Sequence, residues 1–159
     1  MGSKLSPAIS NIFLHMMENI VIKQFMDQNI LLFYCRYVDD CLLIVRKRYK
    51  NLILNKMNNY DSFLEFTCVE MNENSLIFLD TKVIENEGNL ELEQYRKTNN
   101  DSTCIMNYKK SIAPYQYKNS SLNGEIYRAN NCTSNDKNRD LALANLEYIF
   151  INNLYPKKW

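Results

Sequence analysis

Residues 33–45 read Phe33-Tyr34-Cys35-Arg36-Tyr37-Val38-Asp39-Asp40-Cys41-Leu42-Leu43-Ile44-Val45, two apolar segments that meet at a pair of adjacent aspartates. Both segments are rich in the aliphatic and aromatic residues that favour strands, so residues 31–37 and 41–45 are predicted to pair as a β-hairpin. Strands that are apolar on both faces are typical of a buried sheet. The two carboxylates at the hairpin tip would then face a cleft.

Asp39 and Asp40 are the candidate catalytic residues and metal ligands of this sequence. In nucleotidyl transfer, two divalent cations about 3.5–4 Å apart stabilise the attacking and the leaving oxygen, and Mg²⁺ takes oxygen ligands. A hairpin tip can hold such ligands on a rigid backbone. The alternative is ordinary turn chemistry, because aspartate tolerates tight turns.

Hydrophobic spacing predicts an α+β fold around this hairpin. From Ser6 to Phe25 apolar residues recur at intervals of three and four, the pattern of a helix with one buried face, with Ser6 as N-cap and Pro7 as first helical residue. A subdomain boundary is expected near residue 98, where the strand pattern ends. The other predicted elements are a helix at 49–60, strands at 63–71, 76–84 and 90–95, and helices at 121–131 and 135–153.

Composition limits the class of protein. The 159 residues carry a net charge of +1, so any nucleic-acid binding would have to rest on local charge. Five cysteines without a CxxC pair disfavour a disulfide framework and a zinc site, and favour a reducing, intracellular compartment. No apolar run is long enough to span a membrane, so we expect no membrane partner.

A second motif precedes the hairpin. Gly2-Ser3-Lys4-Leu5-Ser6-Pro7, followed by Asn11, resembles motif B of reverse transcriptases, and Tyr37-Val38-Asp39-Asp40 resembles motif C, in the family's order and spacing. Two features depart from the family pattern, Lys4 in place of the usual proline and the absence of a proline after Lys97. Further strings follow the order seen in Penelope-like retroelements: Leu64-Glu65-Phe66-Thr67, Phe78-Leu79-Asp80, Tyr95-Arg96-Lys97-Thr98, Tyr127-Arg128-Ala129 and Asn153-Leu154-Tyr155-Pro156.

The resemblance implies a Penelope-like reverse transcriptase from motif B onward. Residues 1–97 would form a partial palm, and residues 98–159 an α-helical thumb. The complete enzyme would be an RNA-directed DNA polymerase of a retroelement, using two Mg²⁺ ions, deoxynucleoside triphosphates, an RNA template and a DNA primer, and the family is nuclear. Gly2, Ser3 and Tyr37 would contact the template or the incoming nucleotide.

The family takes a further metal ligand from motif A, an earlier strand that these residues do not include. We therefore expect the N-terminal part of the same polypeptide to supply that ligand, and the 159-residue chain to be inactive alone. Asp80 lies beyond motif C and is interpreted as a structural carboxylate, since aspartate is common in turns.

A basic stretch follows the predicted strands. Residues 95–118 hold five basic residues against one acidic residue, interleaved with tyrosines. Because cations follow phosphates and aromatic rings stack on bases, this stretch is a candidate nucleic-acid face of the thumb; the alternative is a solvated loop. The candidate residues, with Arg128 added, are Arg96, Lys97, Lys109, Lys110, Lys118 and Arg128.

Two other functions are compatible with this fold. The chain could be a non-catalytic nucleic-acid-binding remnant that no longer needs Asp39, or a structural or interaction protein with an open sheet edge. Salt-dependent binding that is unaffected by Asp39→Ala would favour the first. Self-association without nucleic-acid affinity would favour the second.

Overall fold

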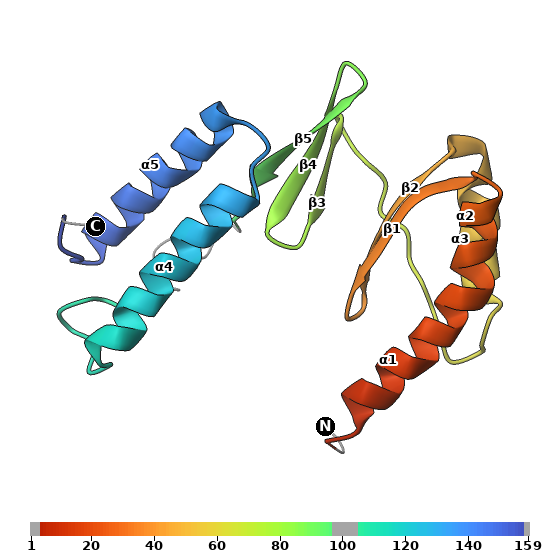
Figure 1. Ribbon diagram of the computed structural model, residues 1–159, viewed down its shortest axis with the longest axis horizontal. Coiled ribbons are helices and arrows are strands. Elements are labelled where there is room, and N and C mark those ends of the chain that lie inside the picture. The colour runs from red at the N-terminus through yellow and green to blue at the C-terminus, as the bar shows by residue number, and fades with distance from the viewer. Residues whose placement is uncertain (1–3, 97–104, 158–159) are drawn as a thin grey trace. The chain divides into compact units, whose positions relative to one another are not determined.

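The computed structural model describes residues 4–96 and 105–157 of the chain. The protein is a mixed α+β structure with helices and antiparallel strands in two small sheets (Figure 1). It divides into two compact units, residues 1–69 and residues 70–159. The expected palm–thumb boundary near residue 98 falls inside the second unit and stays a prediction.

The first unit packs a β-hairpin against helices. The hairpin pairs β1 with β2 in antiparallel register, as predicted (Figure 1). A π-helical segment, η1, joins α1 to α2 in one helical run. The bounds are α1 Ser6–Met17, η1 Glu18–Ile22, α2 Lys23–Asp27, β1 Leu31–Tyr37, β2 Asp40–Val45, the 3₁₀ turn η2 Lys47–Tyr49 and α3 Lys50–Asn58.

The helical run buries only part of its apolar surface. Residues of its core face pack with the hairpin and α3 in one cluster: Met17, Val21, Ile22, Phe25, Leu31, Ile53 and Met57. The prediction of a single buried face was too broad, because Ile9, Ile12, Met16 and Ile20 are exposed. The apolar arc of the helix is wider than the strip that the hairpin and α3 cover.

The start of α1 also differs from the prediction. Leu5, not Ser6, is the N-cap, and no side chain caps the helix. Leu5 already has right-handed helical backbone angles, so Ser6 begins the helix proper. Pro7, predicted as the first helical residue, is the second, and its missing N–H costs no hydrogen bond there because it still lies in the first turn.

The predicted strand at 63–71 is wrong. The Asn58 side chain receives the backbone N–H of Phe66 at 2.6 Å and donates to its carbonyl at 3.1 Å. These two bonds satisfy the backbone N–H and C=O of Phe66, which a strand would pair with a neighbour. The segment therefore runs past α3 without joining a sheet.

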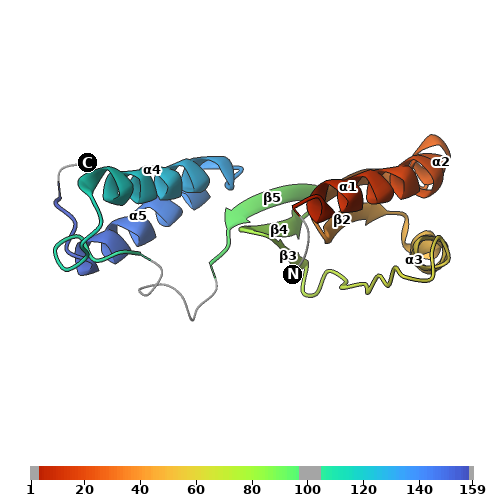
Figure 2. The same cartoon turned by 90° about the horizontal axis from the view of Figure 1, so that it is seen from below.

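The second unit contains a three-stranded antiparallel sheet, in the order β3-β4-β5. The predicted strand at 76–84 is two strands, because Leu79 has a φ of 55° and the chain reverses at Leu79-Asp80. Figure 2 shows the sheet from a second direction. The bounds are β3 Ser75–Phe78, β4 Thr81–Asn86 and β5 Asn89–Gln94.

Two antiparallel helices complete this unit, α4 Tyr115–Asn131 and α5 Asp136–Asn152. They lie side by side (Figures 1 and 2) over a core of Ile105, Leu122, Ala129, Leu146, Ile149, Phe150 and Tyr155. Asn135 caps α5 by accepting the Asn138 N–H at 2.8 Å.

The first turns of α4 lie outside the predicted range of 121–131. Pro114 is extended, with φ −55° and ψ 151°, and the helix starts directly after it. Residues 115–120 lack a run of aliphatic residues at helical spacing, so hydrophobic periodicity missed them. Among the described residues, none of the helices is both long and apolar enough to cross a bilayer.

Candidate functional site

The hairpin tip is a two-residue turn. Tyr37 pairs with Asp40 across the strands, which leaves Val38 and Asp39 as the turn residues. Asp40 therefore belongs to β2. The prediction had placed it in the link between the two strands, at the hairpin tip. Val38 has a φ of 56°, a conformation that is rare for a β-branched residue and that persists only where surrounding contacts enforce it.

Asp39 and Asp40 are both exposed. Among the side chains that the structure describes, neither carboxylate has a hydrogen-bond or ion-pair partner. Tyr37, the third predicted residue here, is 62 % exposed beside them. Two free carboxylates have the oxygen chemistry that Mg²⁺ prefers, but they are a partial ligand set. Within residues 4–96 and 105–157 no group of three or more His, Cys, Asp or Glu side chains could hold a metal ion.

Arg36 connects the turn to the helical run. Its Nη1 donates to the Val38 carbonyl oxygen at 3.0 Å and to Asn11 Oδ1 at 3.2 Å. Its Nε donates to Glu18 Oε1 at 2.5 Å. One guanidinium thus reaches α1, η1 and the turn.

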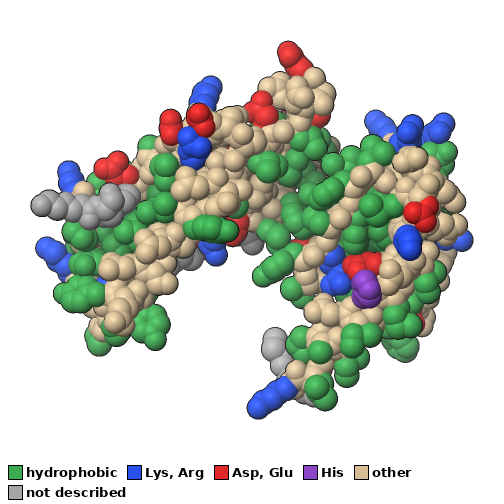
Figure 3. Space-filling model, in the orientation of Figure 1, with side chains coloured by type: hydrophobic (Ala, Val, Ile, Leu, Met, Phe, Trp, Pro, Cys, Tyr) green, Lys and Arg blue, Asp and Glu red, His purple; other side chains and the backbone are tan. Residues whose placement is uncertain are grey.

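Glu18 is the centre of this polar cluster. Besides Arg36, it accepts the Tyr34 hydroxyl at 2.8 Å, and His15 Nδ1 lies 3.5 Å from its other oxygen. Figure 3 shows acidic, basic and histidine side chains gathered over this part of the first unit. Burial by itself raises the pKa of Glu18, but the hydrogen bonds from Arg36 and Tyr34 outweigh burial and hold that pKa below its ordinary value.

The pKa values of the partners shift in the matching directions. The hydrogen bond to Glu18 raises the pKa of Arg36. Burial raises the pKa of Tyr34, helped by contacts with Cys41 and Glu18, and burial also raises the pKa of the Cys41 thiol. The phenol of Tyr34 and the guanidinium of Arg36 therefore keep their protons near neutral pH.

None of the four residues of this cluster, His15, Glu18, Tyr34 and Arg36, was predicted to have a functional role. The signal was present in the sequence, because Arg36 is a charged residue inside an apolar strand and Glu18 interrupts an apolar helix pattern. A buried charge needs a partner, so two such interruptions in neighbouring elements indicate a pair.

Three of the six predicted nucleic-acid-binding residues are already engaged within the protein. Arg96 forms an ion pair with Glu125. Arg128 lies 3.2 Å from Glu125 and 3.5 Å from Asp80, so Asp80, which was interpreted as a structural carboxylate, has an ion-pair partner in the second unit. Gly2, Ser3 and Lys97 lie outside the described residues.

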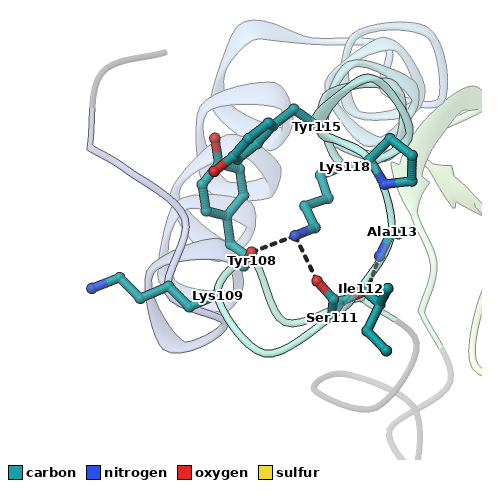
Figure 4. A pocket seen from close by; sticks show the side chains of 8 residues that line it. Tyr108, Lys109, Ser111, Ile112, Ala113, Tyr115 and Lys118 are labelled. Carbon is teal, nitrogen blue, oxygen red and sulfur yellow. Dashed lines mark hydrogen bonds between the residues drawn. The ribbon is translucent and has the colours of Figure 1, made fainter.

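Lys118 is buried, with 5 % of its surface exposed. Its Nζ donates to the carbonyl oxygens of Tyr108 at 2.6 Å and Ser111 at 2.9 Å, and lies 5.3 and 5.4 Å from the ring centres of Tyr108 and Tyr115. Figure 4 shows it pointing into the loop while Lys109 points away. The loop lines a cleft of about 530 Å³, together with Tyr115 and Lys118 at the start of α4. Lys118 is therefore placed to hold the loop in its conformation.

Lys109 and Lys110 are the remaining two predicted cations. Both are exposed, and within the described part of the chain neither side chain has an ion-pair partner. Their backbone N–H groups both donate to Asn107 Oδ1, at 3.2 and 2.9 Å, which fixes the start of the loop.

Comparison of the chain with protein-family models, with curated proteins and with solved structures gave no match.

Proposed function

We propose that this chain is part of an RNA-directed DNA polymerase of a retroelement, in which Asp39 and Asp40 are ligands for Mg²⁺. The supporting observation is a pair of adjacent, exposed carboxylates, Asp39 in the two-residue turn and Asp40 at the start of β2, without a partner among the described side chains. A carboxylate that serves a turn accepts a nearby backbone N–H, as Asp61 does from Phe63 at 2.8 Å. Neither Asp39 nor Asp40 accepts such a bond, which favours a ligand role.

The roles of the residues follow from their chemistry. When bound, Mg²⁺ ions activate the primer hydroxyl and stabilise the charge on the leaving pyrophosphate. Asp39 and Asp40 supply oxygen ligands and offset the charge of the cations. Tyr37 offers an exposed ring beside them for the template or the incoming nucleotide. In this proposal the first unit contributes to a palm, and α4 and α5 form a thumb against RNA template and DNA primer.

The ligand set needs a further carboxylate. Among the described residues no group of three potential ligands exists, and in this proposal the further carboxylate comes from outside them. The test is to express the chain together with any coding sequence found in frame upstream, and to measure primer extension on an RNA template with Mg²⁺. We expect extension from the longer protein and none from the 159-residue chain.

Asp39→Asn is the decisive variant, since it keeps the shape and removes the charge. We expect it to lower extension by more than about 100-fold, because even losing an outer-shell partner of a metal costs roughly 10–100-fold. Asp80→Asn is the matched control and should leave extension unchanged, since that carboxylate pairs with Arg128. Extension that survives Asp39→Asn would refute the metal role. RNA binding without extension, and without dependence on Asp39, would favour the non-catalytic remnant.

A further inference from the structure

The contacts of Arg36 unite three segments that are separate in the sequence. Asn11, His15 and Glu18 follow the spacing of one helix face, so α1 and η1 present two acceptors to the hairpin. The third acceptor is the carbonyl of Val38, inside the turn that carries Asp39. A movement of this guanidinium would therefore move the backbone that leads into the carboxylates.

The chemistry of this cluster requires arginine. A planar guanidinium can donate to several acceptors at once in a fixed geometry, whereas the ammonium of lysine is a compact charge on a flexible stem. The Arg36 and Glu18 side chains are 13 % and 17 % exposed, so solvent and salt screen the pair only in part.

The turn itself needs external support. A positive φ at a valine is strained and persists only when the surroundings over-determine it. The Val38 side chain is 63 % exposed, so packing of that side chain supplies little of the constraint. The hydrogen bond from Arg36 to the Val38 carbonyl acts on the strained residue directly.

We propose that Arg36, held by Glu18, is a positioning residue that fixes the Val38-Asp39 turn and thereby the directions of the Asp39 and Asp40 carboxylates. This inference rests on the proposed metal role of the two aspartates and adds two residues to it. The π-helical form of η1 agrees with it, because single π turns occur frequently at functional sites. Glu18, which anchors Arg36, is the first residue of that segment.

The experiment compares backbone motion at the turn in the full 159-residue chain by ¹⁵N NMR relaxation. Arg36→Lys and Glu18→Ala should lower the order parameters of Val38 and Asp39 from about 0.85 to below about 0.6, while the mid-strand amides of Tyr34 and Leu43 stay rigid. Glu18→Gln keeps an oxygen acceptor and should preserve the rigid turn. Unchanged strand amides show that a variant is folded and that the effect is local.

Arg46→Lys is the matched control. Arg46 follows β2 at the opposite end of the hairpin and donates through Nε to the Asn29 carbonyl at 2.9 Å. It should leave the order parameters at the turn unchanged. If Arg36→Lys also leaves them unchanged, the inference is refuted.

A second measurement separates this inference from the proposed function. Mn²⁺ should broaden the amide signals of Asp39 and Asp40, less so in Arg36→Lys and least in Asp39→Asn. If Arg36→Lys loosens the turn but Asp39→Asn leaves the broadening intact, the metal role of Asp39 fails and the positioning of the turn by Arg36 stands. If Asp39→Asn abolishes broadening while Arg36→Lys changes neither readout, the metal role stands and the inference fails.

Discussion

Glu18 serves three partners with one carboxylate, two of them through the same oxygen. Charge-assisted hydrogen bonds of this kind are about twice as strong as neutral ones. Their acceptor must be ionised, so the contribution of the cluster to stability depends on pH. Because the folded pKa of Glu18 lies below its ordinary value of 4.5, the unfolded state takes up the proton more readily.

The sign of the pH dependence follows directly. The stability from Glu18 is fully present above pH 4.5 and is lost as the pH falls through the lower folded pKa. We expect the wild type to exceed Glu18→Gln in the free energy of unfolding by about 1 kcal/mol at pH 6, with the difference shrinking towards pH 3. Urea denaturation at several pH values, followed by the NMR signals of β1 and β2, measures it.

Glu147→Gln is the control, because Glu147 is exposed on α5. Its difference from the wild type should be small and constant over the same range. A Glu18 difference that grows on acidification would contradict the assignment of Glu18 as an ionised acceptor.

At the scale of elements, the segment before α4 depends on one buried cation. Lys118 reaches back from the helix to two loop carbonyls and is covered by the rings of Tyr108 and Tyr115. Cations over aromatic faces gain additional energy when they are desolvated. The loop therefore gets its conformation from the helix that follows it.

Lys118→Met tests this role, because methionine has a similar linear shape without the charge. Two carbonyls would lose their donor, at a cost of about 1–3 kcal/mol for each buried group left unsatisfied. We expect a lower free energy of unfolding for the second unit and faster amide exchange at residues 108–113. Lys109→Met, at an exposed position of the same loop, should change stability by less than about 0.5 kcal/mol. Equal effects of the two substitutions would contradict the structural role.

At the scale of the whole molecule, fewer basic side chains are free to bind nucleic acid than the sequence suggests. Of the six cations predicted to bind nucleic acid, three are engaged within the protein and two, Lys109 and Lys110, are exposed without an ion pair among the described residues. Each phosphate neutralised on a single strand contributes about −0.7 to the slope of log K against log salt concentration. The slope measured for RNA binding therefore gives the number of cations that contact phosphate.

We expect the double variant Lys109→Met, Lys110→Met to reduce the steepness of this slope by about 1.4. Lys118→Met should weaken binding without changing the slope, because its charge faces the loop carbonyls and not phosphate. Fluorescence anisotropy of a labelled single-stranded RNA across a salt series gives both slopes. If Lys118→Met reduced the steepness of the slope by about 0.7, Lys118 would contact phosphate and the structural interpretation would be wrong.

The accuracy of the sequence predictions depends on how local each interaction is. The hairpin was predicted because its strand pattern and turn are encoded within residues 31–45. The strand at 63–71 failed because the Asn58 side chain takes over the hydrogen bonds of Phe66. The prediction that the whole apolar face of α1 is buried failed, because helical spacing shows that a face is apolar but not whether anything covers it.

The amino-acid sequence by itself determined the α+β class, the pairing of β1 with β2 and the adjacency of the carboxylates of Asp39 and Asp40, since neighbouring residues set these features. The tertiary structure alone decided which charged side chains are paired within the protein and which remain free to bind a ligand. Glu18 and Arg36 are 18 residues apart, Arg96 and Glu125 are 29 apart, and each pair forms only after distant elements meet. Burial and ion pairing are properties of packed surfaces, so residue type and spacing leave them open.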